Sequence, residues 1–186
     1  MNAHDKERLS LIPVLAERHP SHHIGRTALM KYMYFLQSLR GVPLGYSFSM
    51  YSYGPFDSDV LADLSTAESM DLVSSIPVSF SGGYGYRIQA SNRAEKMKEQ
   101  ARDFLAKHQE DIAWVLNEFG ALNSAELELA STVVYVDREL HDIGLTDERA
   151  QLVGVVNEIK PHFRREQVER SVESLRNRGL LISLAA

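Results

Sequence analysis

Residues 24–73 have the sequence IGRTALMKYMYFLQSLRGVPLGYSFSMYSYGPFDSDVLADLSTAESMDLV, and this stretch decides the fold. Its first part predicts a helix from Arg26 to Arg40, because apolar side chains recur there at helical spacing. The central stripe of that helix consists of Leu29, Met33 and Leu36. Gly41 supplies the left-handed residue that ends it. A second helix follows a Gly-Pro pair, and Asp57 or Ser58 is suited to cap its first turn.

Extended segments flank this second helix. Tyr46–Met50 alternates with a period of two, which predicts a strand covered on one face. Leu72–Phe80 and Tyr86–Ala90 predict the two arms of a β-hairpin, joined by a glycine-rich turn at Ser81–Gly85. Two helices followed by a hairpin are the skeleton of a winged helix. We therefore expect a winged-helix-like domain over residues 1–90.

The remainder, residues 91–186, has helical patterning throughout. It begins with a charged segment, Ser91–Lys107, that predicts one helix. Thr146 is suited to cap a later short helix, and a final helix is expected from Arg164 to Arg178. The expected fold class is α+β and mainly helical, with a C-terminal helical region that contains a second helix-turn-helix-like unit.

Composition narrows the class of protein. The 186 residues are 44% hydrophobic and contain no cysteine, which removes disulfides, thiolate nucleophiles and most structural zinc sites. No apolar run approaches the length of a membrane span, and the first residues lack the apolar core of a signal peptide. We therefore expect a cytoplasmic protein without a membrane partner. The net charge of −5 gives no general attraction for phosphate backbones.

Part of the chain resembles known bacterial proteins. The residues that carry the resemblance are Gly25-Arg26-Thr27, Lys31, Tyr34–Gln37, Tyr51–Phe56 and Asp63-Leu64. Over residues 24 to 73 the chain resembles the YwgA-like family, a largely uncharacterised group described as winged-helix-like. Its Tyr-Gly-Pro pattern is also similar, more distantly, to the Panacea (SocA-like) antitoxin domain. That similarity implies binding to another protein, such as a toxin or a proteolytic machine, and neither resemblance brings a catalytic set.

The charge of the second helix separates two kinds of binding protein. A winged helix that binds DNA inserts this helix into the major groove, where lysine and arginine reach phosphates and base edges. Here the segment FDSDVLADLSTAESMD contains five carboxylates and no basic residue. Phosphates repel each carboxylate, so this face is not suited to nucleic acid. The same acids are also typical of an ordinary solvated helix face.

DNA binding through other elements stays open as an alternative. The candidates are Arg87 and Arg93, in and beside the hairpin, and Arg164, Arg165 and Arg170 in the last helix. The last helix also carries glutamates at helical spacing from these arginines, which favours ordinary pairing along the helix surface.

No constellation predicts an enzyme, a cofactor or a metal site. His19, His22 and His23 lie in one loop, but no carboxylate or cysteine stands near them to complete a ligand set. The glycine-rich SGGYG lacks the lysine of a phosphate-binding loop. We therefore expect no catalytic residues.

Aromatic residues point to a protein interface. Tyr32, Tyr51 and Tyr53 fall off the predicted buried stripes, and Phe56 follows the Gly-Pro turn beside them. Tyrosine is enriched at protein interfaces. We expect a non-enzymatic interaction module, antitoxin-like or a regulatory adaptor, whose partner is a toxin or regulatory protein. The alternative is a winged-helix transcription regulator. A homodimer is compatible with the sequence, although no heptad seam demands one.

Overall fold

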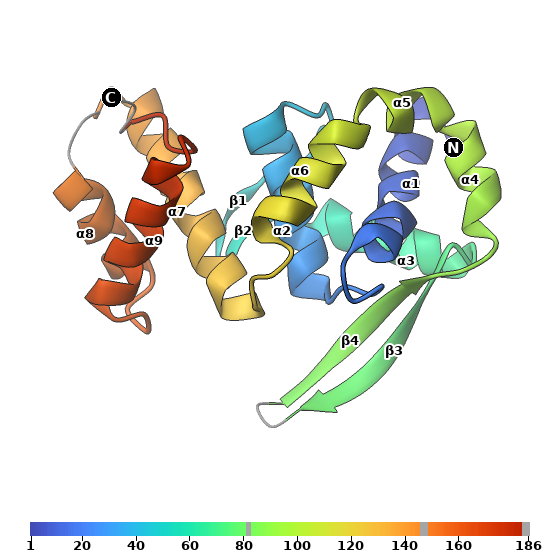
Figure 1. Cartoon of the computed structure of the whole chain (residues 1–186), viewed down its shortest axis with the longest axis horizontal. Coiled ribbons are helices and arrows are strands. Elements are labelled where there is room, and N and C mark those ends of the chain that lie inside the picture. Colours follow the sequence, from blue (N-terminus) through green and yellow to red (C-terminus); the bar gives the residue numbers. More distant parts are fainter. Residues whose placement is uncertain (81–82, 146–148, 184–186) are drawn as a thin grey trace. The chain divides into compact units, whose positions relative to one another are not determined.

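The computed structural model describes residues 1–80, 83–145 and 149–183 (Figure 1). The chain divides into two compact units: unit 1 comprises Met1–Ser49 and Phe56–Ser124, and unit 2 comprises Met50–Pro55 and Ala125–Ala186. Helices dominate the described residues, with two small antiparallel sheets, which confirms the predicted α+β, mainly helical class. None of the described helices is both long and apolar enough to cross a membrane. The predicted turn residues Ser81 and Gly82 and the predicted cap Thr146 lie outside the described residues.

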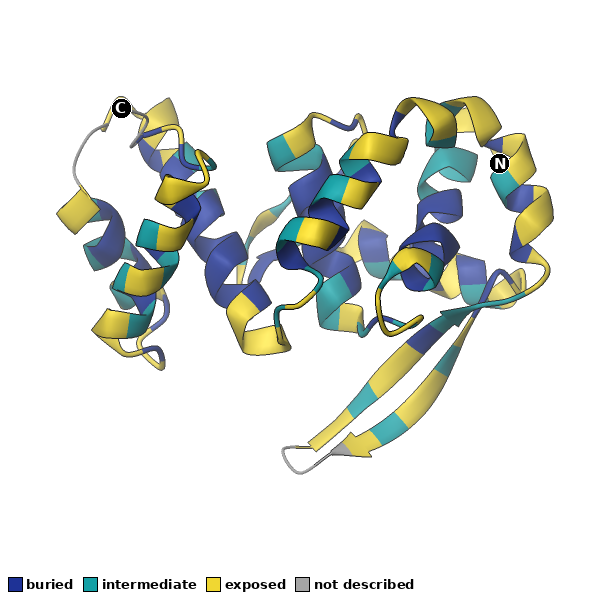
Figure 2. Ribbon diagram, in the orientation of Figure 1, coloured by how far each residue is buried: buried dark blue, intermediate teal, exposed yellow. Residues whose placement is uncertain are grey.

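Two helices form the centre of unit 1. In α1 (Ala3–Arg18) and α2 (Arg26–Arg40), all residues of the middle two turns are buried, including polar Ser10 and charged Lys31 (Figure 2). The other elements of this unit are α3 (Ser58–Ser69), β3 (Val73–Phe80), β4 (Gly83–Ala90), α4 (Ala94–Gln100), α5 (Arg102–Lys107) and α6 (Gln109–Phe119). α1 contacts α3, α4, α5, α6 and β4, which explains why apolar residues surround it rather than line one side. Gly41, at a φ of +66°, ends α2 as predicted.

A single residue outside the hairpin also pairs with β4. β3 and β4 pair antiparallel in the register that runs from Val73 opposite Ala90 to Phe80 opposite Gly83. Ile24, in the loop between α1 and α2, forms an isolated antiparallel bridge with Ile88. The Ile24 N–H donates to Ile88 O at 3.1 Å, and the Ile88 N–H donates to Ile24 O at 2.8 Å. In chain order this region is therefore helix, bridged residue, helix, helix and hairpin.

The segment after the hairpin belongs to unit 1. The single helix predicted for Ser91–Lys107 is instead α4 and α5, interrupted at Ala101, whose N–H is shared between the carbonyls of Met97 and Lys98. The interruption lets the chain turn and keep packing against α1. α6 then packs on α2, where Phe119 stacks on Phe35 with ring centroids 3.9 Å apart. The first unit thus extends to Ser124 and differs from the predicted boundary at Ser91.

A carboxylate joins α6 to the end of α2. Asp111 accepts from Arg40 Nε at 2.8 Å, and its other oxygen lies 2.9 Å from His108 Nδ1. Arg40 also lies over the ring of Trp114, 5.0 Å from its centroid. Partial burial alone would raise the pKa of Asp111, but the hydrogen bonds to His108 and Arg40 outweigh burial and hold this pKa below its usual value.

The described part of unit 2 contains three helices and a short turn. The helices are α7 (Ser124–Asp142), α8 (Arg149–Ile159) and α9 (Arg165–Asn177), and the turn lies between β1 (Ser49–Tyr51) and β2 (Gly54–Phe56). The segment after α9 is fastened to Asp137, a fully buried residue of α7. The backbone N–H groups of Ile182 and Ser183 donate to its carboxylate at 2.8 and 3.1 Å. Such donors compensate the cost of burying a charge.

The strand before the turn starts later than predicted. The alternating pattern predicts a strand over Tyr46–Met50, but β1 begins only at Ser49. The Gln37 side chain forms hydrogen bonds with both backbone groups of Tyr46. Its Nε2 donates to Tyr46 O at 2.8 Å, and its Oε1 accepts from Tyr46 N at 3.0 Å. A side chain of α2 therefore replaces the strand partner that the alternating pattern predicted.

Candidate protein-interaction surface

Two exposed tyrosines occupy the turn between β1 and β2. We name Tyr51, Ser52 and Tyr53 the tyrosine turn. Tyr51 is 64% exposed and Tyr53 is 71% exposed. The next residue, Gly54, has a φ of +86°, a conformation that favours glycine. Both tyrosines are therefore exposed, as the sequence predicted for these two.

A buried ion pair anchors the backbone of this turn. Lys160, 2% exposed, directly follows α8. Its ammonium donates to Tyr51 O at 3.1 Å and to Ser52 O, and lies 3.0 Å from the Glu128 carboxylate. Glu128 belongs to α7 and is 6% exposed. The lysine thus has two carbonyl acceptors and an oppositely charged neighbour, which together compensate the cost of burying it.

A histidine extends this polar group to the surface. His162 Nε2 lies 3.3 Å from Glu128 Oε1, and 56% of the His162 side chain is exposed. Its ring also packs against Phe163, with centroids 4.3 Å apart. Glu128 therefore contacts the amine of Lys160 and an imidazole that is charged only when protonated.

The other two predicted interface residues are placed differently. Tyr32 is fully buried in α2, so its prediction as a surface residue is wrong. It lies off the main apolar stripe of α2, but this helix is covered on its other sides too, and the His19 ring stacks on Tyr32 with centroids 6.0 Å apart. Burial raises the pKa of Tyr32 to about 12. Phe56 is half-buried at the end of β2.

The five acids in and beside α3 have several different roles. Asp57 caps the helix, as predicted, by accepting from Asp59 N at 2.8 Å, and its other oxygen accepts from Ser47 N at 2.5 Å. Asp71 pairs with Arg93 at 2.5 Å. Asp63 is buried. Solvated acids are thus only part of this set, although α3 still presents no basic side chain.

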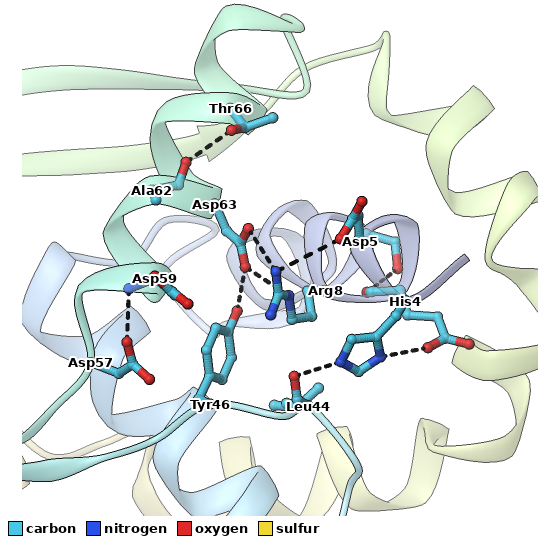
Figure 3. A network of polar contacts seen from close by, with 12 residues as sticks. His4, Asp5, Arg8, Leu44, Tyr46, Asp57, Asp59, Ala62, Asp63 and Thr66 are labelled. Carbon is cyan, nitrogen blue, oxygen red and sulfur yellow. Dashed lines mark hydrogen bonds and ion pairs between the residues drawn. The ribbon is translucent and has the colours of Figure 1, made fainter. Parts of the chain in front are cut away.

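Asp63 is the centre of a polar network in unit 1 (Figure 3). Arg8 Nε lies 3.0 Å from its carboxylate, and the Tyr46 hydroxyl donates to it at 2.8 Å. Burial raises the pKa of Asp63, while the hydrogen bond from Tyr46 and the charge of Arg8 act in the opposite direction. Burial, together with the neighbouring Asp63 charge, also raises the pKa of Tyr46. Next to this group, His4 Nε2 lies 2.9 Å from Leu44 O. The network joins α1, α3 and the loop after α2, so we assign it a structural role.

The arginines considered for nucleic acid fall into separate places. In unit 1, Arg87 is exposed on β4 and Arg93 pairs with Asp71. In unit 2, all three candidates are exposed around the start of α9. Arg165 pairs with Glu169 at 3.0 Å, whereas Arg170 Nε donates to the backbone oxygen of Glu166 at 3.2 Å. Arg164 precedes the first turn of α9.

The loop histidines are engaged by the backbone around them. His19 Nε2 lies 3.0 Å from Gly120 O, and burial lowers the pKa of this histidine. His22 Nδ1 and His23 Nδ1 lie 2.9 and 2.8 Å from the carbonyls of Glu17 and Ser21. Across the described ranges, no three His, Cys, Asp or Glu side chains are grouped so that they could hold a metal ion.

Several of these groups give little signal in the sequence. Glu128 and Lys160 are 32 positions apart, and no motif spacing connects them; the one local hint is a glutamate between two leucines of α7. Asp137 likewise looks like a surface acid of a helix. Arg8 and Asp63 are joined only by the packing of α1 against α3.

No protein-family model matches this chain, and no curated protein matches it significantly. The similarity to the YwgA-like and Panacea families therefore stays a prediction from the quoted residues.

Proposed function

We propose that this chain is a non-enzymatic protein-binding module, antitoxin-like or a regulatory adaptor, that presents the tyrosine turn to another polypeptide. The observation that carries the proposal is the combination of two exposed tyrosines with a buried anchor beneath their backbone. Tyrosine side chains supply large contact areas and are frequent among the residues that dominate binding energy.

The anchor also supports this proposal because it reduces the conformational entropy that the turn would lose on binding. A binding loop that is mobile in the free protein must be ordered on association, and this ordering weakens affinity. Lys160 holds two consecutive carbonyls of the turn, those of Tyr51 and Ser52. The backbone that carries the tyrosines is thereby ordered before a partner arrives.

The arrangement of unit 1 supports a winged-helix-like assignment without a DNA-reading helix. From α1 to β4 the order is helix, bridged residue, helix, helix and hairpin, with the short β1 and β2 inserted before α3, and it resembles the order expected of a winged helix. In such a fold α3 would enter the major groove, but this helix carries acids and no lysine or arginine. We therefore propose that the fold serves as a scaffold for protein contacts.

The test is a double substitution, Tyr51→Ser with Tyr53→Ser, followed by affinity purification from the native host with and without nuclease. We expect the variant to lose a protein that the wild type recovers in both conditions. Ile143→Ser is the matched control, because Ile143 is 69% exposed and lies in the same unit. Unchanged recovery by a folded double variant would refute the role of the turn.

DNA binding through α9 is the second candidate. Its supporting observation is that the guanidinium of Arg170 bonds a backbone oxygen rather than the Glu166 carboxylate, so intrahelical pairing does not neutralise it. A mobility-shift titration on random duplex at low salt would test it. Tight, salt-sensitive binding that Arg164→Ala with Arg165→Ala abolishes would favour this function over the first.

A further inference from the structure

The backbone of β4 has one edge turned toward β3 and one turned away from it. Ile88 exchanges both of its backbone hydrogen bonds with Ile24, so the N–H and C=O of Ile88 point away from β3. Backbone groups alternate between the two edges of a strand, so those of Tyr86 and Tyr84 point the same way. The Ser91 N–H donates to Leu72 O across the hairpin at 3.0 Å, and this bond fits the same alternation.

This outer edge of β4 is covered by Ile24 at its base and is open farther out. A Cβ added at Gly25 would lie 3.7 Å from Tyr86 O, so the backbone at Gly25 still lies beside the edge at the Tyr86 carbonyl. Beyond it, the structure gives no hydrogen bond from a described residue to the amides of Tyr86 and Tyr84 or to the carbonyl of Tyr84. In Figure 1 the hairpin extends as a two-stranded ribbon away from the helices of unit 1.

The outer edge of β3 is less suited to a further strand. Pro77 lies opposite Tyr86 in the register, so its position also faces away from the partner strand. Proline has no N–H, and it therefore interrupts the row of donors on this edge. The hairpin thus has one edge with an uninterrupted row of donors and one edge that a proline interrupts.

The side chains that flank the open edge are aromatic or positively charged. Tyr84 is 88% exposed, and Tyr86, 41% exposed, lies under the Arg26 guanidinium at 3.7 Å from its ring centroid. Arg87 is exposed on the opposite face of the ribbon. The described residues of β3 and β4 include no acid, and neither does the first turn of α2. The charge beside this edge is therefore complementary to carboxylates.

We propose that the outer edge of β4 binds an extended, acidic segment of another protein, which adds as a strand beside Tyr84 and Tyr86. The bridge from Ile24 shows that this edge already accepts antiparallel pairing, and main-chain hydrogen bonds supply affinity in such additions. A second copy of the chain would fit less well, because edge-to-edge pairing would bring like charges from Arg26 and Arg87 together. The proposal does not depend on the tyrosine turn, which lies in unit 2.

The experiment is an NMR titration of the full chain with a capped heptapeptide in which glutamate and valine alternate. We expect saturable shifts of the Tyr84 and Tyr86 amides, slower exchange of both with solvent, and a dissociation constant on the order of 100 µM for so short a ladder. The same peptide with lysine in place of glutamate tests the charge, and it should bind at least several-fold more weakly.

Three variants separate backbone from side-chain effects. Tyr84→Pro removes an outward donor without removing a bond to β3, and it should weaken binding roughly tenfold. Tyr84→Ser removes the ring but keeps the donor, and it should retain most of the affinity. Ser79→Pro is the matched control. Ser79 lies opposite Tyr84, and its replacement by proline removes a backbone donor from the outer edge of β3 instead of β4. Unchanged resonances of α1 and α2 would show that each variant is folded.

Four results would overturn the proposal. These are no peptide binding by the wild type, equal binding by Tyr84→Pro, equal binding of the lysine peptide, and a dimer in sedimentation that only Tyr84→Pro dissociates. Binding of a short DNA duplex that Arg87→Glu abolishes, in a chain that ignores the peptide, would assign the edge to nucleic acid instead.

Discussion

Lys160 and Glu128 are the two residues whose loss has the sharpest expected effect. Lys160→Met leaves the Glu128 carboxylate buried without its main partner, and we expect unit 2 to lose about 3–5 kcal/mol in its free energy of unfolding. The double variant Lys160→Met with Glu128→Leu should recover much of that loss, because an apolar pair of similar volume needs no charge compensation. Urea denaturation followed by circular dichroism measures both. Arg165→Met, at an exposed pair, is the control and should cost about 1 kcal/mol or less.

A lysine variant as stable as the wild type would show that the pair does not stabilise the turn. A lysine variant that is destabilised but still recovers its partner would separate stability from binding. In that case the anchor would have no role in presenting the tyrosines.

Asp111 gives a prediction about pH. Its pKa is lower in the folded chain than in the unfolded chain, so the folded state binds this proton less readily. The resulting stabilisation is fully present above the ordinary carboxyl pKa of 3.8 and is lost as the pH falls from there through the lowered folded value. Unfolding of the wild type and of Asp111→Asn at pH 6 and at pH 3 should therefore show a gap that narrows at pH 3. A gap of equal size at both values would contradict the assigned ion pairing with Arg40.

At the scale of elements, the cap of α3 is the clearest test. Asp57→Ala removes the acceptor for Asp59 N and also the acceptor for Ser47 N, so we expect a loss of about 1–2 kcal/mol. Ser65→Ala, at an exposed position of the same helix, is the control and should be neutral or slightly stabilising. Chemical denaturation of both variants measures the difference. Equal stability of the two would mean that the cap bond contributes nothing in water.

The elements that sequence predicts well are those fixed by neighbouring residues. The Asp57 cap, the Gly41 end of α2, the hairpin and the buried valines of α9 all depend on contacts within a few positions. The break at Ala101 and the late start of β1 depend instead on packing against α1 and on the Gln37 side chain.

The candidate site shows the same division. Exposure of Tyr51 and Tyr53 follows from their place beside a Gly-Pro turn, and it was predicted. Burial of Tyr32 and the Lys160–Glu128 anchor depend on which helices meet, and a single sequence carries no signal for either meeting. A helical stripe predicts what one face buries, but it does not report that a second face is covered as well.

For the whole molecule, the division into two units predicts unequal stability. Lys160→Met should speed amide hydrogen exchange in α7, α8 and α9 and leave the buried centres of α1 and α2 close to the wild type. Hydrogen exchange with mass spectrometry resolves the two sets of segments. Equal acceleration in both would show that the chain opens as a single cooperative body.

The tyrosine turn is encoded in the first third of the chain, yet its backbone is held by a lysine 108 positions after Ser52. During synthesis the turn leaves the ribosome long before the residue that fastens it. Until translation has passed α8, the turn that carries the two tyrosines lacks the hydrogen bonds from Lys160 to its backbone. A polypeptide that ends before Lys160 would contain the same three turn residues but would lack the two hydrogen bonds that hold their backbone.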